Sequence, residues 1–185
     1  MKSFVANLFK AINSLKNMPR QGWVIEGVPK AVAEDVAQHS FEVALIALVI
    51  ALDLKDKVKI NLEKILAMAL IHDLPEAFIG DIIKYTQKFI GNLKEKAEIE
   101  ALNEFIGLDY IIDIYKEYIE GKNTEALIVK IADLTATAIQ AKRYVNNGYS
   151  DVKRILDNTR EAAFRLVKEK IPDAEEIITK IFSSI

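Results

Sequence analysis

Two histidines and two aspartates are the residues of this chain best suited to bind a metal ion. The only histidines, His39 and His72, both lie in apolar, helical patterns. Asp73 directly follows His72, and Asp133 lies in EALIVKIADLTATAIQA, which is apolar around most of its circumference. A buried carboxylate is costly unless a positive charge meets it. Two imidazoles and two carboxylates on buried helices can share one divalent transition metal, which supplies that charge.

Each of these residues also has an explanation that needs no metal. A histidine on a helix face is often a hydrogen-bonded residue of the core or its boundary. Asp73 and Glu76 have the spacing of a capping box, which would explain both by helix initiation alone. Asp133 could pair with Lys130 or Arg143. The order of His, His-Asp and a late buried Asp, which uses every histidine in the chain, favours the metal hypothesis.

These residues lie in segments that resemble the HD superfamily of phosphohydrolases, and within it the compact 5′-deoxynucleotidase branch. The string HDLPEAFIGD, with RQGW and AQHS upstream, carries most of the resemblance. Asp35 and Gln38 stand where that family more often has Ser or Thr and Glu, and KYTQKF is less familiar. The matching segments fall within residues 20–134 and are RQGWVIEGV, EDVAQHSFEVALIA, ALIHDLPEAFIGDI, KAEIEAL and EYIEGKNTEALIVKIADL.

The resemblance implies a set of metal ligands and two catalytic carboxylates. Glu76 and Asp81 would stand beside the substrate phosphate and the attacking water. Glu76 follows the His-Asp pair by one helical turn, where a carboxylate can orient or deprotonate a water. Asp81 follows Gly80 and could instead cap the next short helix. The ligands permit Mn²⁺, Co²⁺, Fe²⁺, Ni²⁺ or Zn²⁺, and the implied ligand set for one such ion is His39, His72, Asp73 and Asp133.

Arg20 and Trp23 are the candidate substrate-binding residues. The guanidinium fork of Arg20 can bind two phosphate oxygens, and Trp23 can offer a flat face to a base or a sugar. Without the resemblance, Arg20 would be interpreted as a surface charge and Trp23 as a hydrophobic lid.

The number of histidines limits the class of reaction that the site can catalyse. No histidine remains to hold a second metal, so one metal, an arginine and two further carboxylates favour removal of a terminal phosphate from a small nucleotide. We therefore expect a metal-dependent phosphomonoesterase that hydrolyses (deoxy)ribonucleoside 5′-monophosphates to nucleoside and phosphate. The alternatives are a nucleotide pyrophosphatase or phosphodiesterase on the same metal core, and a non-catalytic helical interaction protein.

Helices must position these residues. Seven glycines and four prolines interrupt 185 residues, and the apolar residues between them recur at helical spacing. We expect an all-α fold, a single HD-domain helical bundle over residues 1–185. An irregular stretch is expected at 20–29. Helices are expected at 4–15, 34–54, 61–72, from Pro75 onward, and at 93–105, 109–120, 124–146, 151–170 and 173–182.

Composition excludes several functional classes. A formal net charge of −2 without a block of Lys or Arg argues against polymeric nucleic acid and anionic membranes. The absence of cysteine excludes disulfides, thiolate nucleophiles and Cys-ligated metals. The longest apolar run, 43–52, is too short to span a bilayer, and the first residues lack a secretory pattern. We expect a cytoplasmic protein whose partner is a small nucleotide.

A homodimer is implied by the resemblance. The mean hydropathy of +0.11 gives weak independent support, because one small core may not bury every apolar helix face. The candidates for such a face are Ile177, Ile178, Ile181 and Phe182.

Overall fold

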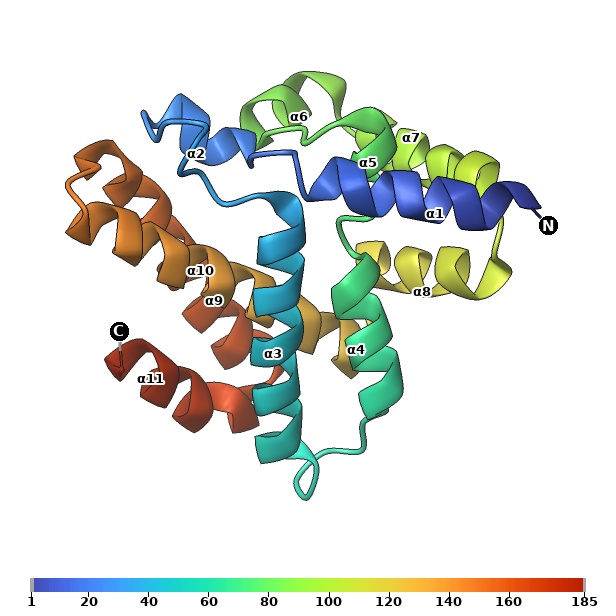
Figure 1. Cartoon of the computed structure of the whole chain (residues 1–185). Helices are drawn as coiled ribbons and strands as arrows, with labels where there is room; N and C mark the ends of the chain where they lie inside the picture. The colour runs from blue at the N-terminus through green and yellow to red at the C-terminus, as the bar shows by residue number, and fades with distance from the viewer. Residues whose placement is uncertain (1, 185) are drawn as a thin grey trace.

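A computed structural model describes residues 2–184, which form one all-α bundle (Figure 1). Short 3-10 turns precede α10 and α11, and a π-helical turn follows α7. The α-helices are α1 (Lys2–Leu15), α2 (Gln21–Ile25), α3 (Val36–Leu54), α4 (Leu62–Ile71), α5 (Glu76–Ile79), α6 (Lys84–Ile90), α7 (Leu93–Ala101), α8 (Asp109–Glu120), α9 (Thr124–Asn146), α10 (Lys153–Lys170) and α11 (Glu175–Ser183).

The centre of the bundle is α3, which packs against α4 and α9 (Figure 1). It begins at Val36 because the Asp35 side chain accepts a hydrogen bond from the Gln38 amide at 2.8 Å and caps the helix. Asn123 caps α9 in the same way through the Ala126 amide, at 2.8 Å. The main core fills the space between these helices and α10 and α11. His39, the end of α4 and Asp133 are thereby fixed on three helices that pack together.

The segment expected to be irregular contains a short helix. In α2, Trp23 is buried and packs with Val28 and Tyr144, and this small cluster attaches the segment to α9. The Gln21 amide donates to Asp81 Oδ2 at 2.6 Å, so a distant carboxylate satisfies the first N–H of the helix. Burial of the tryptophan and this long-range hydrogen bond order a sequence that has no helical periodicity of its own.

Two further departures follow α5. The segment 84–90 forms α6, which the sequence does not predict because the helix has no buried residue and therefore no apolar face. The helix expected at 93–105 is present, but its last turn, Leu102–Ile106, is π-helical and ends at Gly107 with φ of +62°. Glycine adopts this left-handed conformation without steric cost.

The apolar residues of α11 are not the ones left exposed. Ile178 is fully buried, and its three apolar neighbours on the helix pack against the main core. An exposed apolar face lies instead on α3, at Phe41, Leu45, Val49 and Leu52. Among the described residues, α3 alone is long and apolar enough to cross a membrane, but it is the central core helix, with ten buried residues.

The stability of the bundle depends on the inner faces of these helices. Ile65→Ala in α4 removes three carbons from a fully buried side chain, and we expect unfolding to become easier by about 2–5 kcal/mol. Leu70→Ala removes three carbons from the same helix at a side chain that is 58% exposed, and should cost about 0.5 kcal/mol or less. Urea denaturation of both variants measures the difference. Equal losses would contradict the assignment of the core face of α4.

Candidate metal centre

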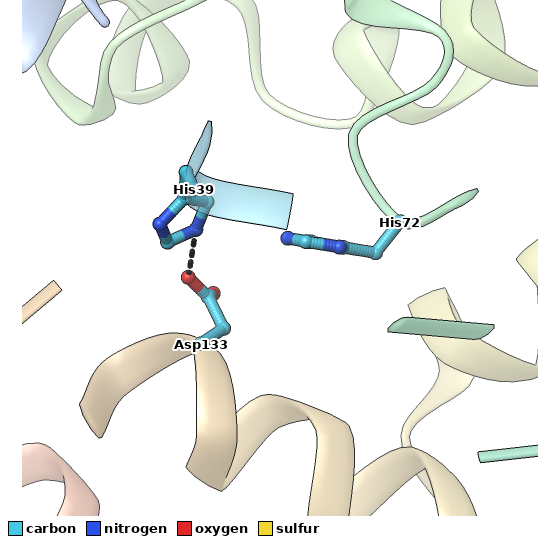
Figure 2. Close-up of side chains that lie close together, drawn as sticks. All are labelled: His39, His72 and Asp133. Carbon is cyan, nitrogen blue, oxygen red and sulfur yellow. Dashed lines mark hydrogen bonds and ion pairs between the residues drawn. The ribbon is translucent and has the colours of Figure 1, made fainter. Parts of the chain in front are cut away.

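Three helices bring two imidazoles and one carboxylate together inside the bundle. His39 lies one turn into α3, His72 follows the last residue of α4, and Asp133 lies in the middle of α9. Each offers one ligand atom, and these atoms all lie within 4.8 Å of one another (Figure 2). His39 Nε2 is 3.0 Å from Asp133 Oδ1. The geometry is that of a compact cluster able to surround one cation.

His72 carries the clearest sign of a missing partner. Its Nδ1 lies 2.7 Å from the carbonyl oxygen of Ala69 and must donate to it, since a carbonyl only accepts. Its Nε2 is buried and makes no hydrogen bond. Every other buried side-chain N or O atom among the described residues has a hydrogen-bond partner. Buried polar atoms are almost always satisfied. The orphaned Nε2 therefore fits a metal ligand that points into the cluster.

Asp73, the residue after His72, lies beside this cluster. Its Oδ2 lies 3.3 Å from His72 Nε2 and 4.0 Å from His39 Nε2. Burial disfavours the charged forms of both Asp73 and His72, but their mutual attraction outweighs it. The pKa of Asp73 falls well below its usual range, and that of His72 rises to about 9. The carboxylates thus draw a positive charge to Nε2, and a metal ion can replace the proton there.

The explanations without a metal do not match these contacts. The side chain of Asp73 caps no helix, since α5 begins at Glu76 after Pro75 and has no side-chain cap. Asp133 pairs with His39 instead of Lys130, which donates to a backbone carbonyl, or Arg143, which pairs with Glu42. Although burial opposes it, the hydrogen bond from His39 lowers the pKa of Asp133 to about 2.

His39 has the tautomer opposite to that of His72. Arg20 Nη1 lies 2.8 Å from His39 Nδ1, and because arginine only donates, Nδ1 accepts and Nε2 carries the proton. Burial and the charge of Arg20 lower the pKa of His39 to about 4, so the ring is neutral. Coordination through Nε2 requires this proton to move to Nδ1, where the nearest carboxylate oxygen is Glu34 Oε2 at 3.9 Å.

A cavity of about 840 Å³ opens from the cluster, within the size range of small-molecule sites. Its wall includes Glu76, whose side chain is buried. Burial and the negative charges of Asp73 and Asp81 raise the pKa of Glu76 to about 10. A cation held by the neighbouring carboxylates opposes this shift by attraction and favours the ionised form. Glu76 thus lies on the wall of the cavity that also includes His72, Asp73 and Asp133.

Asp81 and Arg20 are brought together by the start of α2. Asp81 does not cap α6, whose first residues have no side-chain cap, but accepts from the Gln21 amide. Arg20 precedes that residue and lies inside the cavity wall near Thr137 and Glu34, at 3.4 and 3.6 Å from Nη1. Arg20 is therefore not a surface charge.

Trp23 borders the cavity but is largely a core residue. Its side chain is 2% exposed, its ring packs edge-on against Tyr144, and its indole N–H donates to Glu34 at 3.1 Å. The Arg20 guanidinium lies 5.8 Å from the ring centre. The structure thus gives Trp23 a clear role in holding Glu34 and Arg20.

Sequence reasoning missed Glu34, Lys94 and Glu98. Glu34 is the first residue of the helix expected at 34–54, where a charged side chain is usually exposed, whereas in the structure it precedes α3 and is buried. Glu98 lies in KAEIEAL, one of the segments that resemble the superfamily, which was the available signal. Lys94, one helical turn earlier, lines the cavity with Glu76.

The matches to known proteins agree with this geometry. The model of the HD domain family matches residues 12–175, and the chain belongs to that family. A 5′-deoxynucleotidase HDDC2 of Dictyostelium discoideum is 35% identical over 146 residues, which cover 74% of this chain and 75% of that protein. The 5′-deoxynucleotidase PM0747 of Pasteurella multocida is 28% identical over 162 residues, covering 80% of each chain.

Solved structures show the same fold. A conserved hypothetical protein from Pyrococcus furiosus superimposes with a TM-score of 0.84 at 37% identity, covering 96% of this chain and 99% of its own. An HD-domain phosphohydrolase from Listeria innocua, at 19% identity and a TM-score of 0.65, shares the fold over 94% and 95% of the two chains.

The orphaned imidazole nitrogen leads to a direct prediction. His72→Ala should reduce bound divalent metal from about one ion per chain to nearly none, because ligand loss costs on the order of 10–100-fold or more in affinity. Elemental analysis after dialysis measures the content. Asn158→Ala, which changes a cavity residue outside the ligand cluster, should keep the metal. Full metal content in His72→Ala would show that the ion binds elsewhere.

Proposed function

We propose that this protein is a metal-dependent 5′-deoxynucleotidase, which hydrolyses deoxyribonucleoside 5′-monophosphates to nucleoside and phosphate. The observation that carries the proposal is the unsatisfied Nε2 of His72, which lies among His39, Asp73 and Asp133 at the inner end of a cavity lined by Glu76. Relatives described as 5′-deoxynucleotidases, matched over about three quarters of the chain, support the same reaction.

The proposed ligands of one divalent ion are the two histidines together with Asp73 and Asp133. Mn²⁺, Co²⁺, Fe²⁺, Ni²⁺ and Zn²⁺ all accept such nitrogen and oxygen donors. When bound, the ion supplies positive charge to the phosphate and makes a nearby water more acidic.

The protein side chains accept the proton, bind the phosphate and position the substrate. Glu76 accepts one proton of the water that attacks phosphorus, and this proton passes to the 5′-oxygen as the bond from phosphorus to that oxygen breaks, so the products are the nucleoside and hydrogen phosphate. The Arg20 guanidinium is placed to bind phosphate oxygens once it leaves His39. Asp81 holds the segment that carries Arg20, and Trp23, which borders the cavity beside Arg20, is the proposed contact for the base or the sugar.

A screen of phosphate release tests the proposed reaction. Chelator-treated protein is given each of the five metals in turn and tested on deoxyribo- and ribonucleoside 5′-monophosphates, with 3′-monophosphates as controls. We expect phosphate and nucleoside as products from 5′-substrates only. Release of pyrophosphate from triphosphates, or cleavage of diesters without phosphate release, would point to a pyrophosphatase or phosphodiesterase instead.

Glu76→Gln tests the role of the buried carboxylate. The amide keeps the shape of the side chain but cannot accept the proton of the water, so kcat should fall by about 10²–10⁴-fold while metal content stays at the wild-type level. Glu95→Gln, an exposed residue at the same cavity, is the matched control and should keep wild-type kcat. Wild-type kcat in Glu76→Gln would exclude Glu76 as the base, and lost metal would make it a ligand.

We further propose a cytoplasmic homodimer that buries the exposed apolar face of α3. Four large apolar side chains on one helix face are unusual for a surface that meets only water. Leu45→Glu should therefore yield a monomer by light scattering at micromolar concentration. Phe89→Glu, at a residue 88% exposed on α6, should leave the dimer intact. A wild-type monomer would reject the dimer, and a dimeric Leu45→Glu would place the interface elsewhere.

A further inference from the structure

A row of three charged side chains connects α7 to the carboxylate of Glu76. Lys94 lies in the first turn of α7, and its Nζ is 2.7 Å from Glu98 Oε1, one helical turn further along. The same Nζ is 3.9 Å from Glu76 Oε1 on α5. All three side chains line the cavity that opens from the metal cluster. The ammonium thus bridges a carboxylate of its own helix and the proposed catalytic carboxylate.

Glu98 is far more buried than the carboxylates of most ion pairs on helix surfaces. It is 3% exposed, and among the residues that the structure describes it forms a salt bridge with Lys94 alone. Most ion pairs between residues four apart on a helix lie in water and contribute little. A buried carboxylate needs a hydrogen-bonded cation to offset its desolvation. Burial, followed by the charge of Glu98, raises the pKa of the Tyr115 phenol on α8, so the two side chains lie close together.

Glu76 is otherwise surrounded by negative charge. Asp73 and Asp81 face it from the turns on either side of α5, and both disfavour its ionised form. Arg20 and Lys94 are the cations that oppose them. Arg20 is engaged with His39 Nδ1, Thr137 and Glu34, whereas Lys94 points from α7 toward Glu76 itself.

We propose that Lys94 is a positioning residue for the reaction. Glu98 holds the Lys94 ammonium in place, and the ammonium keeps the Glu76 carboxylate turned into the cavity. The inference rests on the proposed function, because it assigns Glu76 as the group that accepts the proton. Lys94 acts through Glu76, so it affects the rate of the chemical step more than the binding of substrate.

The test compares charge, shape and location in the metal-loaded protein. Lys94→Met keeps most of the apolar stem and removes the ammonium, Lys94→Arg restores a cation, and Lys96→Met changes an exposed lysine of the same helix. We expect kcat for a deoxyribonucleoside monophosphate to fall by about 10–100-fold in Lys94→Met with KM and metal content unchanged. Lys94→Arg should recover part of the loss, and Lys96→Met should match wild type.

Glu98→Gln and crystal structures complete the test. Glu98→Gln should lower kcat and cause no further loss in a Lys94→Met background, because both changes release the same ammonium. Crystals of metal-loaded Lys94→Met should show the Glu76 carboxylate turned away from its wild-type position, a result that needs no activity. If wild type releases no phosphate but Glu76 moves, the positioning holds and the proposed function fails.

Two outcomes would overturn the proposal. A rise in KM with kcat unchanged would make Lys94 a direct ligand of the substrate phosphate. An unchanged Glu76 position together with wild-type kcat in Lys94→Met would leave the pair with Glu98 as a purely structural contact of α7.

Discussion

The structure depends on the compensation of negative charge inside a helical bundle. Asp73 and Asp133 have pKa values held below their usual range, so both are ionised within a cluster enclosed by α3, α4 and α9. In low dielectric, such charges are tolerated only beside positive groups. His72, with its pKa raised to about 9, and Arg20 supply part of the positive charge that these carboxylates need. A divalent ion on the orphaned Nε2 of His72 would meet it more fully.

The need to compensate buried negative charge also explains why segments that are distant in sequence meet at the cluster. The chain between α1 and α3 adds Arg20, Trp23 and Glu34, which contact one another, and Arg20 and Glu34 also lie beside His39. Asp81 ties that segment to the region after α5 through the Gln21 amide. The cavity is thereby enclosed by parts of the chain that are separated in sequence but linked by polar contacts. The residues proposed to bind substrate, to accept a proton and to hold the metal are consequently linked through shared polar contacts.

Much of the fold could be predicted from periodicity, and part of the site from residue type. The long helices, such as α3 and α9, have apolar patterns, and two rare histidines with two aspartates pointed to one cluster. The helix α6 has no buried face, so no pattern marks it. The π-turn after α7 and the burial of Glu34 depend on contacts made by residues far apart in sequence. Pairings such as that of Asp81 with the Gln21 amide leave no local signal.

Anomalous scattering from crystals of protein loaded with Co²⁺ would test the central claim most directly. We expect one strong peak per chain at the cobalt edge, within about 2.0–2.2 Å of one nitrogen of each imidazole. Carboxylate oxygens of Asp73 and Asp133 should complete the ligands, with the open side of the ion facing Glu76. A peak elsewhere in the molecule, or an unoccupied cluster with His72 still hydrogen-bonded only to Ala69, would contradict the metal centre and the reaction built on it.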